Sequence, residues 1–432
     1  MFIYSNGQYP DPIPGAAVTH DPRVPLVLVS GLAPGPAATF AELVRASGPG
    51  TAVVHHDLRD IHSGVVRRRL RFEQRDQLTV LELAHGCVSC TLREDLLPLL
   101  RRLARMPQVR RIVVRLDEAM EPEPVSWAIR NVLVGDHPVI DDVDLRAVFT
   151  VVNCATWLSD VTGDDLLEER NLQASPEDER TVAQVALSQV EFADVLVLAG
   201  AATDAWSAAK SAAVLDRVAP SVPRVELSRV DGHTVFDAVP SDARRGEVTD
   251  MHGALLRGEP PLHADCGIAV LTFTAQRPFH PERLHDAIDV LLDGVVRTRG
   301  RAWVASQPDV AFWIESAGGG LGIGHAGPWL ASPGGPEWTD VSPERRTLAS
   351  LRWDPVWGDR AQELVVVTDQ ATPAEVDTVL RGALLTDEEL ADGAEAWLRY
   401  PDPFGEWHEE PCEDTEISAK HDATASNRKE DQ

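Results

Sequence analysis

The chain has 432 residues, 44% of them hydrophobic, and a formal net charge of −28 at pH 7. Its length and apolar content allow more than one buried core, which predicts two or more domains, while the negative charge argues against extensive direct binding of nucleic acid. Since no apolar run approaches the roughly 20 residues of a membrane span and residues 1–23 lack the pattern of a secretion signal, we expect a cytoplasmic protein without a membrane partner.

After an N-terminal extension at 1–22, residues 23–240 alternate short apolar runs with helical patterns. This alternation is typical of an α/β domain in which crossover helices join the strands of a parallel sheet. The expected strands are 26–30, 51–55, 78–83, 112–116, 147–152 and 195–198.

Residues 31–39 follow the first expected strand, where a nucleotide-binding fold of this type has its P-loop. A working P-loop needs a glycine, a lysine for the phosphates and a Ser or Thr for magnesium. The corresponding positions hold Gly31, Gly35, Pro36, Ala37 and Ala38. Proline removes an amide donor, and alanine supplies neither charge nor oxygen. Because no lysine precedes Lys210, a shifted alignment cannot restore the motif, and we expect neither GTP nor magnesium as a cofactor.

A Gly-Cys-Val-Ser-Cys run at 86–90 lies between an expected strand and an amphipathic helix. With only five cysteines in the chain, a disulfide framework is disfavoured, and Cys87 and Cys90 are better interpreted as metal-binding or redox-active. Glu82 and His85 are the nearest candidates to complete a tetrahedral zinc site around the two thiolates. Two alternatives remain: reduced thiols without a ligand, and a redox switch.

The polar segment 241–265, rich in Gly, Pro and His, predicts a linker to a second domain over 266–412. That domain has an α+β pattern. Its expected strands are 267–274, 302–305, 311–315 and 363–368, and its expected helices are 281–292, 373–383 and 387–397. Residues 413–432 are charged and almost devoid of bulky apolar side chains, which predicts a disordered tail.

From about Val24 to Trp407 the chain resembles the CobW family of P-loop GTPases and metal chaperones. The resemblance rests on the Gly-Cys-x-x-Cys run with the Thr-Leu-Arg and acidic residues that follow it, at 86–95, and on the segments 277–284, 297–303 and 358–364. It implies a P-loop-NTPase-like parallel sheet with crossover helices, followed by a smaller α+β domain of the CobW C-terminal type.

The chain also departs from the family pattern. Ala-Gly-Ala-Ala at 199–202 replaces the guanine-reading Asn-Lys-x-Asp, residues 117–124 replace a Glu-x-x-Gly segment, and Ser89 replaces the middle cysteine. Since phosphoryl transfer depends on the groups that are lost, we expect a pseudo-GTPase rather than an enzyme. Losing a thiolate should also weaken metal binding. Further candidate ligands lie where the family has a switch region: His55, His56, Asp57 and His62.

Within the family, the chain resembles an actinobacterial subgroup with a degenerate P-loop. That subgroup includes the mycobacterial factor that recruits a hibernation-promoting protein (protein Y) to ribosomes when zinc is scarce. The resemblance implies a zinc-responsive, non-catalytic adaptor whose partner is the hibernation factor or the ribosome. An acidic protein can meet basic ribosomal proteins by electrostatic steering. The alternative is a zinc metallochaperone that serves a client metalloprotein and retains some nucleotide control.

Overall fold

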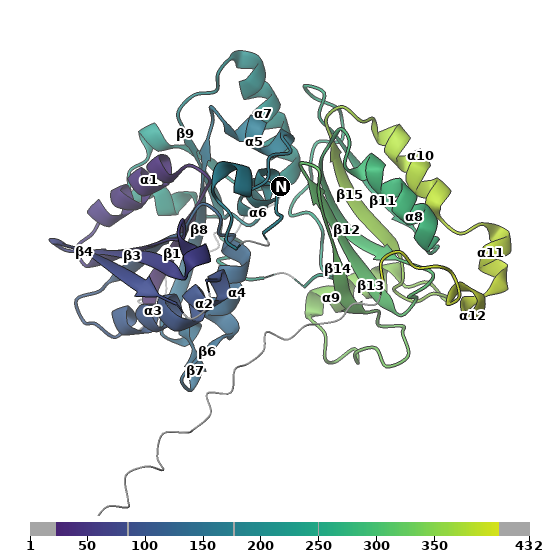
Figure 1. Ribbon diagram of the computed structural model, residues 1–432, viewed down its shortest axis with the longest axis horizontal. Coiled ribbons are helices and arrows are strands. Elements are labelled where there is room, and N and C mark those ends of the chain that lie inside the picture. The colour runs from purple at the N-terminus through teal and green to yellow at the C-terminus, as the bar shows by residue number, and fades with distance from the viewer. Residues whose placement is uncertain (1–22, 84–85, 176–177, 249, 406–432) are drawn as a thin grey trace, which may run out of the picture.

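The computed structural model describes residues 23–83, 86–175, 178–248 and 250–405. The chain forms two bodies side by side, each built on its own large sheet (Figure 1). The expected N-terminal extension and the expected tail lie outside the described residues. None of the helices within the described ranges is long and apolar enough to cross a bilayer.

The first sheet has eight strands in the order β10-β9-β8-β1-β5-β2-β3-β4. Neighbouring strands pair in parallel except at β2–β3 and β3–β4, which are antiparallel. Its strands are β1 (Val24–Ser30), β2 (Thr51–Asp57), β3 (Val65–Phe72), β4 (Arg75–Glu82), β5 (Arg111–Arg115), β8 (Val143–Asn153), β9 (Val195–Ala199) and β10 (Arg224–Glu226). The mostly parallel α/β fold expected from the sequence is confirmed, and all six expected strands are present.

Helices cover both faces of this sheet because successive residues of a buried parallel strand point to opposite sides. On β1, Val27 and Val29 pack with the residues of α1 (Pro34–Ala46), whereas Leu26 and Leu28 pack with those of α3 (Leu97–Ala104). The remaining helices of this body are α2 (Val88–Thr91), α4 (Pro122–Asn131), α5 (Trp157–Thr162), α6 (Val182–Glu191) and α7 (Ala205–Val218), and a π-helical turn at Leu92–Leu96 joins α2 to α3.

The second sheet is antiparallel throughout, in the order β11-β15-β12-β13-β14. Its strands are β11 (Ala269–Ala275), β12 (Val295–Trp303), β13 (Val310–Ala317), β14 (Gly320–Pro328) and β15 (Gln362–Thr368). Helices α8 (Pro281–Ala287) and α10 (Pro373–Ala383) cover the face that points away from the first body (Figure 1). The single helix expected at 387–397 is instead two, α11 (Asp387–Asp392) and α12 (Ala394–Trp397), because Gly393 adopts a φ of 79°. Helix α9 (Pro343–Arg352) lies between β14 and β15 in the sequence.

Polar contacts fix the two bodies to each other. Glu191 at the end of α6 accepts hydrogen bonds from Arg297 at 3.0 Å and from Arg299 at 3.2 Å, both on β12. On α7, the Lys210 ammonium lies 2.6 Å from an oxygen of Asp369. The described residues of the expected linker, 241–265, form neither a helix nor a strand of either sheet. They are held against β12, where Arg301 donates to two of their carbonyl groups.

Candidate metal site

The fold brings the Cys87 and Cys90 thiols together at the start of the helical stretch 88–104. Cys87 is the N-cap of α2, with an extended backbone, and its Sγ accepts a hydrogen bond from the Cys90 amide at 3.2 Å. The two Sγ atoms lie 2.9 Å apart. Position 86, directly before the motif cysteines, requires a glycine, because a Cβ there would lie 1.9 Å from the carbonyl oxygen of Ile61. The two-residue spacing and this glycine therefore place both sulfurs on one side of the motif.

The other two predicted ligands do not join the thiols within the described part of the chain. Glu82 is exposed at the end of β4, and His85 lies outside the described residues. Over those ranges, no group of three or more His, Cys, Asp or Glu side chains is arranged to hold a metal ion. Glu82 and His85 as ligands therefore stay predictions.

The thiol pair fits a soft metal ion after a small adjustment. In tetrahedral zinc sites the Zn–S distance is about 2.3 Å, which puts two sulfurs roughly 3.8 Å apart. The observed separation of 2.9 Å means that the pair must open by about 0.9 Å. Rotation of these half-buried side chains can supply a movement of that size.

The candidate ligands His55, His56 and Asp57 of the expected switch region are used by the fold rather than gathered into a metal group, whereas His62, in the 3-10 turn at Ile61–Ser63, is exposed. His56 on β2 lies with its Nε2 2.7 Å from Oδ2 of Asp95. His55 Nδ1 lies 3.1 Å from the Arg115 carbonyl oxygen, and burial together with the Arg115 charge lowers the pKa of His55 to about 4. Asp57 accepts hydrogen bonds from Arg59. These groups therefore position β2 and the motif rather than offering open ligand positions.

Asp95 is a site residue that sequence reasoning did not recognise. It lies in the π-helical turn after the cysteines and also forms an ion pair with Arg68 on β3. Burial raises its pKa, but the hydrogen bond from His56 and the charges of His56 and Arg68 outweigh burial and hold the pKa below its ordinary value. Asp95 thus fixes the helical stretch that carries the thiols to the sheet.

The segment that corresponds to a P-loop is largely the first turn of α1, which begins at Pro34. The Ala37 amide donates to the Ala33 carbonyl at 3.1 Å, and the Thr39 hydroxyl donates to the Gly35 carbonyl at 3.0 Å. An Arg115 guanidinium nitrogen donates to the Pro34 carbonyl at 3.2 Å. A P-loop binds phosphate with backbone amides that point into an open loop. Here the Ala37 amide is engaged inside the helix.

Two acidic residues, Asp117 and Glu118, follow β5. Asp117 accepts hydrogen bonds from the amides of Leu58 and Ala119, and burial raises its pKa. Burial and the neighbouring Asp117 raise the pKa of Glu118 to about 7. A carboxyl group that is half protonated near neutral pH is a poor ligand for magnesium, which favours charged oxygens.

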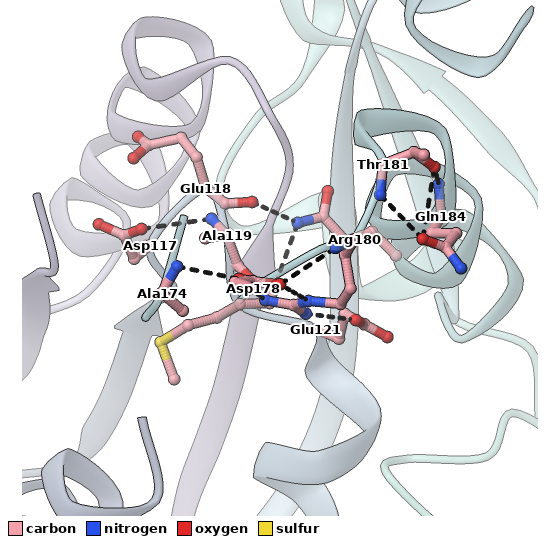
Figure 2. A network of polar contacts seen from close by, with 11 residues as sticks. Asp117, Glu118, Ala119, Glu121, Ala174, Asp178, Arg180, Thr181 and Gln184 are labelled. Atoms are coloured by element: carbon pink, nitrogen blue, oxygen red, sulfur yellow. Dashed lines mark hydrogen bonds and ion pairs between the residues drawn. The ribbon is translucent and has the colours of Figure 1, made fainter. Parts of the chain in front are cut away.

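An ion-pair network holds the segment that follows these acids. Figure 2 shows Arg180 joined to both Asp178 and Glu121, at 2.8 Å and 2.6 Å respectively. Gln189 on α6 donates to the carbonyl groups of Glu118 and Met120, each at 3.0 Å. The residues that replace the family's Glu-x-x-Gly segment are therefore fixed by α6 and the loop before it.

Two family profiles match the chain. "CobW/HypB/UreG, nucleotide-binding domain" matches residues 40–226, and "Cobalamin synthesis protein cobW C-terminal domain" matches residues 268–384. The zinc chaperone Rv0106 of Mycobacterium tuberculosis is 44% identical over 400 residues, which cover 90% of this chain and 95% of that protein. The chain belongs to the CobW family. The resemblance stated from the sequence is thereby confirmed for the family and for both of its domain types.

A further relative and a solved structure also align along most of this chain. Zinc-regulated GTPase metalloprotein activator 1 of Dictyostelium discoideum is 26% identical over 410 residues, covering 88% of this chain and 84% of that protein. The crystal structure of the Zn(II)-bound YjiA GTPase from E. coli covers 84% of this chain and 99% of its own, with 15% identity and a TM-score of 0.36. The match to the nucleotide-binding profile begins at residue 40, directly after the segment 31–39.

Proposed function

We propose that this CobW-family protein carries zinc on Cys87 and Cys90 and passes it to a client protein without hydrolysing GTP. The observation that carries the proposal is the pair of thiols held 2.9 Å apart at a helix start. Thiolates are soft ligands that suit zinc, and a site with few protein ligands releases its ion readily. A relative that is named a zinc chaperone and is 44% identical supports zinc as the cargo.

The absence of nucleotide hydrolysis is supported by the helical start of α1. Phosphoryl transfer needs a positioned lysine and a magnesium ligand, and the segment holds Pro36, Ala37 and Ala38 at the relevant positions. The Ala37 amide is also engaged inside α1. Saturable, magnesium-dependent GTP turnover by the purified protein, well above a buffer blank, would contradict this part of the proposal.

Zinc stoichiometry of the full chain tests the metal site. The double variant Cys87→Ser/Cys90→Ser should lose the bound zinc equivalent, measured by competition with a chromophoric chelator. Cys154→Ser is the matched control. This cysteine directly follows β8 and is not part of the motif, so the substitution should leave the stoichiometry unchanged. If the double variant binds as much zinc as the wild type, the thiol pair is not the site.

A second candidate function is the zinc-responsive adaptor that helps to recruit a hibernation factor to ribosomes. The specific observation in its favour is the combination of the helical start of α1 with a net charge of −28, because a protein without a nucleotide cycle can still act by binding basic partners. Pull-downs from zinc-replete and zinc-starved cells separate the candidates. The adaptor requires ribosomal or hibernation proteins in the zinc-starved sample, whereas the chaperone requires a client metalloprotein.

A further inference from the structure

A cleft of about 570 Å³ lies between the two bodies, away from the segment that corresponds to a P-loop. Its walls come from α4, from the segment 241–265, from β12 and β13, and from Ser89 and Arg93 of the helical stretch that carries the thiols. Cavities of roughly 300–1,000 Å³ at domain interfaces are the usual size and place of small-molecule sites.

Two arginines of β12 lie on the inner wall of the cleft. Arg297 and Arg299 share the single carboxylate of Glu191, and Arg297 also reaches Glu315 at 3.3 Å. The guanidinium of Arg299 lies 5.1 Å from the centroid of the Trp313 ring. These arginines are therefore already neutralised in part, and they fix the shape of the wall.

Arg244, from the segment 241–265, is a further cation of the cleft. Its guanidinium lies 5.5 Å from the centroid of the Phe192 ring, its Nε is buried, and within the described ranges that nitrogen has no hydrogen-bond partner and the side chain no ion pair. Burial and the charges of Arg257 and Arg299 lower its pKa to about 10 against the opposing charges of Glu123 and Glu191, so it is still charged at neutral pH. A desolvated cation without a partner is costly to keep. Arg244 therefore points to an anion that completes the site.

Glu123 is an acid of the same cleft, and its charge acts on Arg244 without an ion pair between the two side chains. Burial raises the pKa of Glu123, whose carboxyl faces the same cleft from α4. Close by on α4, the Trp127 side chain is 51% exposed and lines the cleft together with Leu92 and Val248. The cleft thus offers a flat apolar surface and an unpaired cation.

We propose that the interdomain cleft binds a planar organic anion whose charged group pairs with Arg244 and whose ring lies against Trp127. Neither the thiol pair nor a nucleotide is part of this site, so it is independent of the proposed zinc function. Arginine suits such an anion because its planar fork can donate two hydrogen bonds to one carboxylate or phosphate.

The test is a titration of the full chain with anilinonaphthalene sulfonate, followed by its fluorescence, with benzoate and phenyl phosphate as competitors that distinguish carboxylate from phosphate. Inorganic phosphate is the anion without a ring. We expect the fluorescent probe to bind saturably and at least one ring-bearing competitor to displace it. Inorganic phosphate should displace the probe at least about tenfold more weakly, since it lacks the ring contact. Equal displacement by inorganic phosphate, or no displacement at all, would overturn the proposal.

Two variants assign the contacts. Arg244→Met keeps an unbranched, flexible apolar stem and removes the charge, and it should weaken binding at least about tenfold, because a charge-assisted contact is lost. The same variant should raise the thermal midpoint of the ligand-free chain, because a buried unpaired charge disappears. Arg229→Met, at an arginine that is 80% exposed, is the matched control and should change neither quantity. Unchanged affinity in Arg244→Met, or a lowered midpoint, would show that Arg244 is structural.

Trp127→Ala keeps the proposal testable if the first variant folds poorly, since half of this side chain is exposed. It should weaken binding of phenyl phosphate by about threefold to tenfold, the range expected for one aromatic contact, and leave binding of inorganic phosphate unchanged. An unchanged affinity for phenyl phosphate would contradict the assignment of the ring to Trp127.

Discussion

His56 on β2 and Asp95 beside the thiol motif are joined by a contact of 2.7 Å, although 39 positions separate them in the chain. The His56 side chain is 3% exposed and that of Asp95 is 13% exposed. Arg68 on β3 forms an ion pair with the same carboxylate. One acidic side chain therefore serves two buried or half-buried partners and connects the motif to the sheet.

Removing this carboxylate should destabilise the protein. Asp95→Ala removes the carboxylate partner of His56 and leaves Arg68 with the Thr79 hydroxyl alone, and the expected loss in the free energy of unfolding is about 2–3 kcal/mol. Urea denaturation measures it. The control is Asp377→Ala, which breaks an exposed pair within α10 and should cost no more than about 0.5 kcal/mol. Equal losses in the two variants would mean that Asp95 does not anchor the motif.

The raised pKa of Glu118 predicts a dependence of stability on pH. Its pKa is about 7 in the folded chain against an ordinary value of 4.5, so the folded state binds the extra proton between these values. Stability from this group is therefore present below about pH 4.5 and is lost as the pH rises to about 7. Glu118→Gln should not show that loss. Its free energy of unfolding should therefore rise relative to wild type, as the pH goes from 4.5 to 8, by on the order of 3 kcal/mol. Chemical denaturation at several pH values measures it, with the exposed Glu388→Gln as control; a pH-independent difference would refute the assignment.

Gly86 and Gly35 form a matched pair of backbone tests. An added Cβ at Gly86 would lie 1.9 Å from the Ile61 carbonyl oxygen, whereas one at Gly35 would meet nothing within 4 Å. Gly86→Ala should lower stability by at least about 2 kcal/mol and reduce zinc binding. Gly35→Ala should be neutral or stabilise by up to about 1 kcal/mol, since Gly35 lies in α1. Thermal unfolding with zinc titration checks both, and a tolerated Gly86→Ala would mean that the motif can move away from Ile61.

Glu191 is the acid on which the contact between the bodies depends. Its pKa is lowered by Arg297 and Arg299 even though burial raises it. Glu191→Gln leaves Arg299 without its charged partner and Arg297 with Glu315 alone, and it should cost about 3–5 kcal/mol. We expect calorimetry to resolve two transitions instead of one as the bodies lose their coupling. A single transition at the wild-type midpoint would argue that other contacts hold them together.

Local patterns predicted the parts of the fold that depend on local chemistry. The strands 26–30 and 195–198 are continuous apolar runs, and helix α10 begins and ends where expected, because Thr372 and Pro373 form a strong start signal. Strand β3 was missed because four of its eight residues are arginine. A strand of that composition looks like a charged surface until its neighbours are known.

The candidate sites likewise include a part that is local in the sequence and a part that depends on long-range contacts. The thiol pair could be predicted, since a spacing of three positions at a helix start is a local property. Neither the role of Asp95 nor that of Arg244 could be predicted. The partner of Asp95 lies on a distant strand, and Arg244 belongs to a segment interpreted as a linker whose neighbours come from both bodies. Long-range juxtapositions leave no periodic signal in the sequence.

The pair formed by Lys210 and Asp369 has a practical consequence for chemical labelling. Lys210 is the only lysine between residues 1 and 419, and its ammonium is held 2.6 Å from an acid of the other body. An amine-reactive reagent or a lysine-specific protease will therefore meet one such group in the described part of the chain. The rate at which this amine reacts is a direct measure of how often the two bodies separate.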